Sequence, residues 1–447
     1  MKKPVIEVGI FSADCISFKL NGRFSSGTNH LCNMKGEACT ADGDAVLLRT
    51  EGEQRICEKV ILLEPEDGGE DAFFELFDVV IGLEFHWERK RNMSFKGKLK
   101  LMVCDGRIMA VNVLPLEEYL LSVIASEMSA SSSVEFLKAH AVISRSWLLA
   151  QMEKSRALRS AVVYETVIRS DEGYMRWYDR EEHKMFDVCA DDHCQRYHGF
   201  AQATSIQVAE AMRVTAGEVL MHDGKICDAR FSKCCGGITE AFENVWEPVV
   251  HPYLSMVVDS LEQNAPSPDL TSEEEAKRWI MSEPAACCNT DNLVELSQVL
   301  TGYDFETRDF FRWTATLQQD EVQRLLSAKT GMDFGEILDL VPVERGVSGR
   351  IVRLKIVGSR QCLTVGKELE IRKLLSSSHL YSSAFVVEKV FDGANIRTPT
   401  SFILHGAGWG HGVGLCQIGA AMMGARGYSY REILNHYFPG AILYKVY

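Results

Sequence analysis

The sequence predicts an α+β protein with mixed β-sheets, and three observations favour this class. Short runs of alternating apolar and polar residues fill residues 1–110, as in "CISFKLNGRF" and "KLKLMVCDGRIMAVNVL", with Gly, Asn and Asp between them. This pattern is typical of strands joined by turns. Helical periodicity then extends from Pro115 to about Gln151. Strands resume at residues 349–358, "GRIVRLKIVG", so the chain combines both kinds of element.

The chain has 447 residues, enough for two or three domains, and we expect four consecutive regions. They are a β-rich N-terminal region (1–110), the first part of a core (111–259), a mixed α/β insertion or subdomain (260–345) and the second part of the core (346–447). The insertion is indicated by two amphipathic helical patterns, "SPDLTSEEEAKRWI" and "LQQDEVQRLLSAKTG". Within the core, residues 200–251 are expected to be rich in strands.

The composition limits the classes of function. A formal charge of −14 makes nonspecific binding of nucleic acid an unsuitable main activity, and an anionic polymer would need a local site. No apolar run approaches the roughly 20 residues of a membrane span. The start, "MKKPVIEVGIF", is better interpreted as a first strand than as a secretory signal, since Pro4 and Glu7 interrupt it. Either the protein is cytoplasmic or an export signal has been removed.

A glycine-rich stretch, "GWGHGVG" at residues 408–414, has glycine at every second position. Its spacing matches neither a P-loop nor a dinucleotide-binding fingerprint. Alternating glycine indicates an extended segment with one bare face, where a flat ligand or another backbone lies close. Two roles remain for the segment: Trp409 or His411 contacts a ligand, or the glycines allow tight packing around a buried Trp409.

Glu127 is the first candidate for chemistry. In "PLEEYLLSVIASEM", an apolar stripe at helical spacing includes Tyr119 and Val123, and the next position on that face is Glu127. Three interpretations give Glu127 no catalytic role: the last turn of the helix frays, the carboxylate is exposed, or the carboxylate pairs with an arginine. The catalytic interpretation is that Glu127 is a partly desolvated carboxyl group with a raised pKa, which acts as a general acid.

The following helix carries an arginine on its apolar face. Ser132 and Glu135 form a capping-box pattern at its start, and the stripe that follows places Arg145 four residues after Ala141. Arg145 either pairs with a carboxylate or orients Glu127 or a substrate.

A third candidate is a group of metal-ligand side chains in "HKMFDVCADDHCQRYH". His183, Cys189, His193 and Cys194 offer four nitrogen and sulfur ligands, which suits a closed, structural zinc site. The alternative is surface histidines beside buried thiols, and His198 is a substitute ligand. Elsewhere, the adjacent cysteines at 234–235 and 287–288 are either buried thiols or disulfide partners.

Taken together, these segments resemble the SpoIID/LytB family of stage II sporulation protein D and the amidase enhancer. The matching pieces occur in family order and span most of residues 90–447. They are "FKGKL" (95–99), "VNVLPLEEYLLSVIASEM" (111–128), "LKAHAVISRSW" (137–147), "DDHCQRYHG" (191–199), "AGEVLMHDGKICDARFSKCCGGITEAFENVW" (216–246), "RGVSGRIVRLKIVG" (345–358) and "GWGHGVGLCQIGAAMMGARGYSYREILNHYFPG" (408–440).

The resemblance implies a lytic transglycosylase that cleaves peptidoglycan glycan strands, preferably without stem peptides, between N-acetylmuramic acid and N-acetylglucosamine. It implies that Glu127, in the Ser-Glu-Met element, is the catalytic acid, in a helical segment lining a long substrate cleft. Zinc at His183, Cys189, His193 and Cys194 is implied by the His/Cys set of some members. We expect Arg145, Trp409, His411 and Gln417 to contact the glycan.

The chain departs from the family pattern at several positions. Ser129 follows Ser-Glu-Met where proline is usual, the next helix reads Ser144-Arg145-Ser146 in place of Ala-Arg-Thr, and Cys416 stands where serine is usual. These differences concern the chemistry of the groove and its redox state, and they leave the proposed acid in place.

Two rival functions remain. Since other family members enhance an N-acetylmuramoyl-L-alanine amidase, the chain is alternatively a glycan-binding partner of such an amidase that does not cut. A cysteine hydrolase using Cys416 or Cys235 with His411 lacks a recognisable nucleophile–base–orienter set. The substrate implies a location in the cell envelope, periplasmic or extracytoplasmic.

Overall fold

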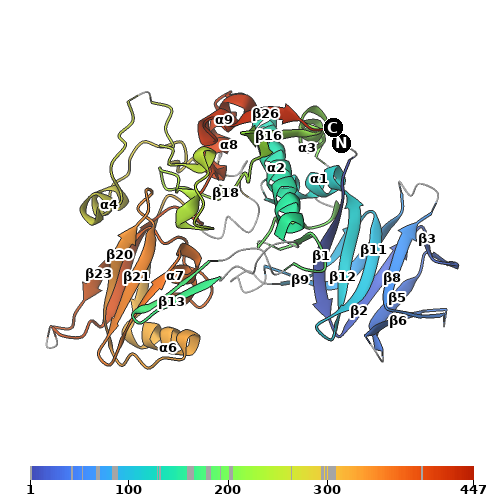
Figure 1. Cartoon of the computed structure of the whole chain (residues 1–447), viewed down its shortest axis with the longest axis horizontal. Coiled ribbons are helices and arrows are strands. Elements are labelled where there is room, and N and C mark those ends of the chain that lie inside the picture. The colour runs from blue at the N-terminus through green and yellow to red at the C-terminus, as the bar shows by residue number, and fades with distance from the viewer. Residues whose placement is uncertain are drawn as a thin grey trace. The chain divides into compact units, whose positions relative to one another are not determined.

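The computed structural model confirms the α+β class, with helices beside several separate β-sheets (Figure 1). The residues that the structure describes are 3–41, 44–52, 54–66, 71–82, 89–127, 129, 132–158, 166–177, 183–191, 193–200, 205–262, 264–292, 296, 300, 309–393 and 396–447. The chain forms two compact units, the first with Met1–Arg145, Glu181–Glu218 and Lys445–Tyr447, the second with Ser146–Arg180 and Val219–Tyr444. The units are therefore interleaved along the chain, whereas the sequence predicts four consecutive regions.

The first unit contains a seven-stranded sheet. In spatial order its strands are β15 (Val188–Cys189), β1 (Val5–Ala13), β12 (Arg107–Pro115), β11 (Lys98–Cys104), β8 (Val60–Pro65), β3 (Arg23–Ser26) and β4 (Asn29–Cys32). β1 pairs antiparallel with β12 and parallel with the short β15, so a segment far along the chain joins the N-terminal strand. Ile6, Val8 and Ile10 alternate along β1 and are buried, which is the period of two that the sequence pattern predicts.

A six-stranded antiparallel sheet also belongs to the first unit. Its strands are β10 (Arg89–Phe95), β9 (Phe73–Ile81), β2 (Cys15–Asn21), β5 (Lys35–Ala41), β6 (Ala45–Thr50) and β7 (Arg55–Glu58). A disulfide between Cys15 and Cys39 links β2 to β5, where these two residues lie opposite each other in the register. The prediction of strands throughout residues 1–110 is confirmed for the described part of that region.

The helices of the first unit follow directly from β12. α1 (Leu116–Glu127) begins one residue after Pro115, which ends the strand instead of starting the helix as predicted. α2 (Val134–Leu158) starts in the first unit and is capped by Ser133, whose Oγ accepts the Phe136 N–H at 3.3 Å. The helix therefore begins one residue later than a cap at Ser132 predicts.

One short helix of the first unit was not expected. α3 (Ile206–Val214) lies within residues 200–251, where the sequence predicts mainly strands. It buries Val208, Ala211 and Met212 and contacts α1. Its small apolar face explains why the helical pattern was not recognised.

The second unit contains four small sheets. The five-stranded sheet contains β13 (Val167–Ser170), β14 (Gly173–Arg176), β22 (Cys362–Gly366), β21 (Ile351–Gly358) and β20 (Ile337–Arg345). One three-stranded sheet contains β19 (Arg312–Gln318), β24 (Ser401–Ala407) and β23 (Phe385–Val390), and another contains β17 (Lys225–Ile226), β16 (Glu218–His222) and β26 (Ile442–Lys445). The two-stranded sheet pairs β18 (Phe231–Ser232) with β25 (Leu415–Cys416). Its helices are α4 (Glu273–Ile280), α6 (Gln319–Thr330), α7 (Glu368–Leu374), α8 (Gln417–Ala425) and α9 (Tyr430–Tyr437), with short 3₁₀ turns at Phe242–Asn244 and Pro252–Leu254.

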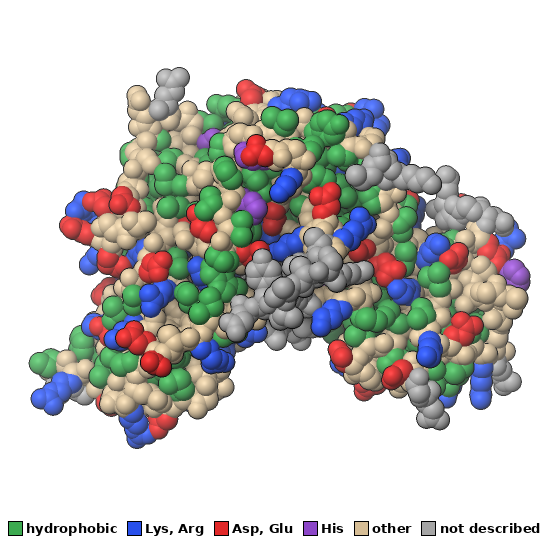
Figure 2. Space-filling model, viewed as in Figure 1, with side chains coloured by type: hydrophobic (Ala, Val, Ile, Leu, Met, Phe, Trp, Pro, Cys, Tyr) green, Lys and Arg blue, Asp and Glu red, His purple; other side chains and the backbone are tan. Residues whose placement is uncertain are grey.

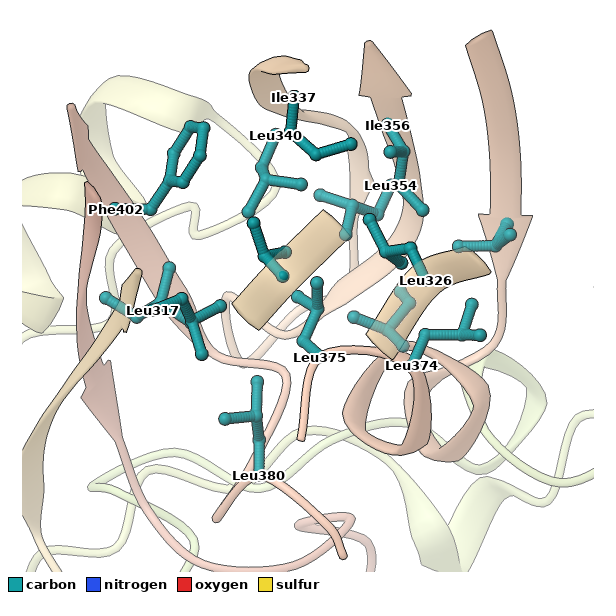
Figure 3. Close-up of a cluster of buried hydrophobic side chains, with 14 of the residues drawn as sticks. Leu317, Leu326, Ile337, Leu340, Leu354, Ile356, Leu374, Leu375, Leu380 and Phe402 are labelled. Atoms are coloured by element: carbon teal, nitrogen blue, oxygen red, sulfur yellow. The ribbon is translucent and has the colours of Figure 1, made fainter. Parts of the chain in front are cut away.

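Two of these sheets share a hydrophobic core with α6 and α7. Leu326 of α6 and Leu374 of α7 point toward Leu340, Leu354 and Ile356 of the five-stranded sheet (Figure 3). The remaining core residues are Trp313, Leu317, Val322, Phe334, Ile337, Ile351, Leu363, Val365, Ile371, Leu375, Leu380, Phe385, Phe402 and Leu404. This core therefore joins residues on both sides of position 345, where the sequence predicts the end of the insertion. Both helices predicted in the insertion are present, as α4 and α6.

Charged side chains of both signs are mixed on the molecular surface. On the face shown in Figure 2, Lys and Arg side chains are interspersed with Asp and Glu. Within the described part of the chain, the helices lack the length and apolar character that crossing a membrane requires.

Candidate functional site

Glu127 is the last residue of α1 and is 8% exposed, so the burial predicted from helical spacing is confirmed. Its Oε1 accepts the backbone N–H of Arg196 at 2.9 Å, and the neighbouring Ser126 Oγ accepts the N–H of His198 at 3.3 Å. The end of α1 is thereby held against the segment 193–199. The Arg196 N–H fixes the direction of this carboxyl group, and Glu127 as a residue keeps 8% of its area exposed.

The packing below Glu127 explains why α1 lies in this position. The rings of Tyr119 and Tyr197 lie 5.0 Å apart, and the Tyr119 hydroxyl donates to Gln195 Oε1 at 3.3 Å. Burial, followed by negative charge on Cys194, Cys189 and Glu127, raises the pKa of Tyr119 well above its ordinary value. The Tyr119 hydroxyl therefore stays protonated at neutral pH and is a permanent donor beneath the helix.

The four residues expected to bind zinc lie together in the first unit. The ligand atoms of His183, Cys189, His193 and Cys194 all lie within 4.8 Å of one another. His183 Nε2 is 3.2 Å from His193 Nδ1, and Cys194 Sγ is 3.6 Å from the same nitrogen. Two imidazoles and two thiols at these distances fit a tetrahedral zinc ion. His198, the substitute ligand, does not belong to this group and contributes its N–H to Ser126 instead.

The surroundings of the cluster anchor it to the seven-stranded sheet. Cys189 lies in β15, which pairs with Val8 and Gly9 of β1. A Cβ on Gly9 would lie 2.5 Å from the ring of Phe186, so only glycine leaves room for that ring. Phe186 in turn packs on His183, with ring centroids 4.9 Å apart. The cluster therefore rests on a strand at one end and leads to the segment that contacts Glu127 at the other.

Arg145 is fully buried and forms a two-pronged ion pair with Glu117. Its Nε donates to Oε1 at 2.8 Å and its Nη2 to Oε2 at 2.7 Å, while Nη1 donates to the carbonyls of Ala141 and Glu218. Burial raises the pKa of Glu117, but the hydrogen bonds and charge of Arg145 outweigh this effect and the pKa lies below its usual value. Of the two sequence interpretations, the structure shows pairing with a carboxylate, and contact of Arg145 with glycan stays a prediction.

The glycine-rich segment is not the regular extended strand that the sequence predicts. All four glycines have positive φ, between +73° and +89°, and the β-type pairing described for the segment consists of isolated bridges at Trp409 and Val413. A Cβ on Gly412 would lie 2.4 Å from Arg350 Cζ, and one on Gly414 would lie 2.1 Å from the carbonyl oxygen of Arg230. The glycines therefore permit a tightly wound backbone against other parts of the second unit.

The side chains of this segment are only partly accessible. Trp409 is half-buried between Phe310, stacked at 5.1 Å, and Tyr381, edge-on at 4.9 Å. His411 is also half-buried; burial and the charges of nearby arginines hold its pKa well below the ordinary value, so the ring is neutral at neutral pH. Gln417 is 3% exposed at the start of α8. The packing role of the glycines is thus observed, while contact of these three residues with glycan stays a prediction.

Glu127 belongs to the first unit, and Trp409, His411 and Gln417 belong to the second. The cleft that would combine them also stays a prediction. The cysteine-hydrolase alternative finds no support in the described residues: the His411 Nδ1 accepts the Val413 N–H at 3.0 Å, whereas Cys416 and Cys235 are buried among other sulfur atoms.

Two groups were missed from the sequence. The backbone N–H of Arg196 donates a hydrogen bond to Glu127. Because every residue except proline has a backbone N–H, the sequence pattern does not predict which of them bonds to Glu127. Asp259 is fully buried beside Cys235 and Cys288. A run of apolar residues before it, "YLSMVVD", is the single local sign of its burial.

Comparison with known proteins gives two family matches. Residues 104–222 match the family described as stage II sporulation protein, and residues 240–414 match a domain of unknown function, DUF8618. The chain is 26% identical over 349 residues to an uncharacterized protein of Brachyspira hyodysenteriae, covering 78% of this chain and 72% of that one.

Two named relatives come from Bacillus species. The stage II sporulation protein D of Bacillus amyloliquefaciens is 24% identical over 338 residues, covering 74% of each chain. The amidase enhancer of Bacillus subtilis is 23% identical over 277 residues, covering 56% of this chain and 34% of the enhancer. The stage II sporulation match lies over α1, α2 and the His/Cys cluster, so in this part the chain is similar to the SpoIID/LytB family.

Proposed function

We propose that the protein is a lytic transglycosylase that cleaves peptidoglycan glycan strands, preferably without stem peptides, between N-acetylmuramic acid and N-acetylglucosamine. The observation that carries this proposal is the placement of Glu127. It is a single carboxyl group, 8% exposed and held by a backbone N–H, at the glutamate of the Ser-Glu-Met element. Similarity to proteins named for sporulation stage II and for amidase enhancement supports a role in the cell wall.

The proposed reaction needs only one carboxyl group. Protonated Glu127 donates its proton to the glycosidic oxygen as the bond from that oxygen to C1 of the muramic acid breaks. The 6-hydroxyl of the same sugar then forms a bond to C1 and returns its proton to Glu127. The products are a 1,6-anhydro ring and a free 4-hydroxyl, so no water is consumed and the carboxyl group is regenerated. Hydrolases that use two carboxylates differ in this respect.

We also propose that His183, Cys189, His193 and Cys194 hold a structural zinc ion. Two nitrogen and two sulfur ligands would fill its coordination shell, so the ion would organise the chain and take no part in proton transfer. The segment that it would order continues to Arg196, whose N–H bonds to Glu127 at 2.9 Å. The role of these ligands toward the reaction is therefore positional.

A second candidate function rests on the amidase enhancer. Similarity over 56% of this chain supports a protein that binds glycan and stimulates a cell-wall amidase without cutting. Both functions place the protein outside the cytoplasmic membrane, where peptidoglycan lies. They differ in the products that the purified chain makes by itself.

The test compares wild type, Glu127→Gln and Glu118→Gln on denuded and peptide-bearing glycan strands, with product ends identified by mass spectrometry. Glu118 is an exposed carboxylate of the same helix and serves as the matched control. We expect 1,6-anhydro ends from wild type and Glu118→Gln, and a loss of at least about 10³-fold in Glu127→Gln.

Circular dichroism and glycan pull-down establish that the Gln variant is folded and binds. Anhydro products at the wild-type rate from Glu127→Gln would refute the assignment of the acid. A wild-type chain that forms no anhydro ends but accelerates an added amidase would support the enhancer function instead.

A further inference from the structure

A second cluster of metal-ligand side chains lies inside the second unit, and neither the proposed reaction nor the zinc site described above uses it. Its members are Cys235, Asp259, Cys288 and Cys416. Each is at most 2% exposed. Three thiols and one carboxylate in an interior are unusual, because burying a carboxylate is costly unless a cation or several donors compensate it.

The ligand atoms of this cluster are spaced for a single ion. All four lie within 4.8 Å of one another, with Cys235 Sγ at 3.6 Å from Cys288 Sγ and 3.4 Å from Asp259 Oδ2. Zinc–sulfur bonds of about 2.3 Å in a tetrahedron separate the sulfur atoms by about 3.8 Å. Iron–sulfur clusters distribute their cysteines over several iron atoms and need wider spacing. The cluster therefore fits one tetrahedral ion.

Backbone donors already point at these ligands. The N–H of Cys235 donates to Cys416 Sγ at 3.2 Å, that of Gly237 to Cys235 Sγ at 3.4 Å, and that of Cys288 to Asp259 Oδ2 at 3.1 Å. Tyr437 donates its hydroxyl to the other carboxylate oxygen of Asp259 at 2.6 Å. Such second contacts orient metal ligands and stabilise thiolate charge. His436 lies farther away, with Nε2 at 3.9 Å from Asp259 Oδ1.

The chain around the cluster is fixed by arginines and by a glycine. Arg350 and Arg312 donate at 3.1 Å to the carbonyls of Cys235 and Gly236, which holds the turn that carries Cys235. A Cβ on Gly419 would lie 2.4 Å from the Tyr437 hydroxyl and 2.7 Å from Asp259 Oδ1, so this position in α8 leaves room for the buried carboxylate. The site is thus built by several segments.

We propose that Cys235, Asp259, Cys288 and Cys416 bind a structural Zn²⁺ ion in the interior of the second unit. Zinc suits the ligand set because it accepts thiolate and carboxylate ligands in tetrahedral geometry. The ion would connect the turn after β18, the loop after α4 and the end of the glycine-rich segment. It would thereby hold DUF8618 residues to the strand pair β18–β25 within one unit.

A disulfide between Cys235 and Cys288, the pair at 3.6 Å, is the main alternative use of these thiols. It would leave Cys416 and the Asp259 carboxylate outside the covalent bond, with the hydrogen bonds from Cys235, Cys288 and Tyr437 described above. The zinc site uses all four groups, and this difference in stoichiometry makes the two possibilities separable.

The experiment measures zinc in the full chain by mass spectrometry of the element, in wild type and in Cys189→Ser/Cys194→Ser, which removes the other site. We expect about two zinc ions per chain in wild type and about one in the double variant. Adding Cys416→Ser to the double variant should remove the remaining ion, whereas adding Cys227→Ser, a substitution of a buried cysteine outside the cluster, should retain it.

X-ray absorption of the wild-type zinc tests the same point without a substitution. Two sites, with two and three sulfur ligands, give an average of about 2.5 sulfur atoms per zinc, and the first site alone gives about two. The proposal is overturned by a wild-type chain with about one zinc at two sulfur ligands, or by a peptide map that shows Cys235 joined to Cys288.

Discussion

The two cysteine-containing clusters differ in how the chain assembles them. The first takes His183, Cys189, His193 and Cys194 from twelve consecutive residues, and all four are at least partly exposed. The second takes its four ligands from positions 235 to 416, and all are buried. A local cluster can form as soon as its own segment folds, whereas a cluster of distant residues exists only in the folded unit. The first cluster should therefore affect mainly the site around Glu127. The second cluster should affect mainly the stability of the folded unit.

The largest expected effect concerns metal release. With a chelator in excess, zinc at the half-exposed cluster should leave at least about a hundred times faster than zinc at the buried cluster, because the buried ion requires opening of the unit. Stopped-flow absorbance of a coloured chelator measures both phases, and Cys189→Ser/Cys194→Ser should remove the fast phase alone. A single phase of full amplitude in wild type would contradict this difference.

Arg145→Met tests whether the first unit depends on its ion pair rather than on its cluster. Removing one partner of a buried pair should lower the free energy of unfolding by about 3–5 kcal/mol at neutral pH. Urea unfolding with the first cluster's zinc content measured in parallel is the check, and zinc binding should persist. Lys138→Met, which breaks a more exposed pair with Glu135, should cost under about 1 kcal/mol.

The same pair predicts a pH dependence. The folded-state pKa of Glu117 is lowered, so its stabilisation is present above the unfolded-state pKa and is lost as pH falls through the folded-state pKa. The stability difference between wild type and Arg145→Met should accordingly shrink in acid. Urea midpoints measured from pH 7 to pH 3 would contradict this assignment if the difference stayed constant.

Loss of the first cluster should affect catalysis more than stability. In Cys189→Ser/Cys194→Ser the segment that carries Arg196 is less constrained, and a small displacement of Glu127 should reduce the rate of anhydro-product formation about 10- to 100-fold. The rate and the melting temperature are measured on the same preparation. A folded variant with the wild-type rate would show that the cluster does not position Glu127.

A further effect on stability is expected in the glycine-rich segment. Gly412→Ala and Gly427→Ala both impose positive φ on alanine, but a Cβ meets Arg350 at position 412 and open space at position 427. We expect a cost of about 1 kcal/mol for Gly427→Ala and about 1–3 kcal/mol more for Gly412→Ala. Equal unfolding free energies for the two variants would mean that the contact with Arg350 relaxes without cost.

Much of the first unit could be predicted because its signals are local. The helical spacing of Tyr119, Val123 and Glu127 identified the buried face of α1, and the His/Cys spacing identified a cluster that the structure brings together. The cap of α2 was displaced by one residue, since both Ser132 and Ser133 suit that position. α3 was not recognised because a short helix with three buried residues leaves a weak pattern.

The sequence by itself determined which residue types occupy which faces: a carboxyl group on an apolar stripe, four zinc-type ligands in one segment, and glycine at alternate positions. Only the tertiary structure decided what these groups meet. Arg145 pairs with Glu117, 28 residues away, and the Cys235 N–H bonds to Cys416, 181 positions away. The alternating glycines pack closely against Arg230 and Arg350. The physical reason is that the periods of helices and strands determine which way a side chain points relative to its neighbours in sequence. Which residue it contacts depends on how distant segments pack against each other.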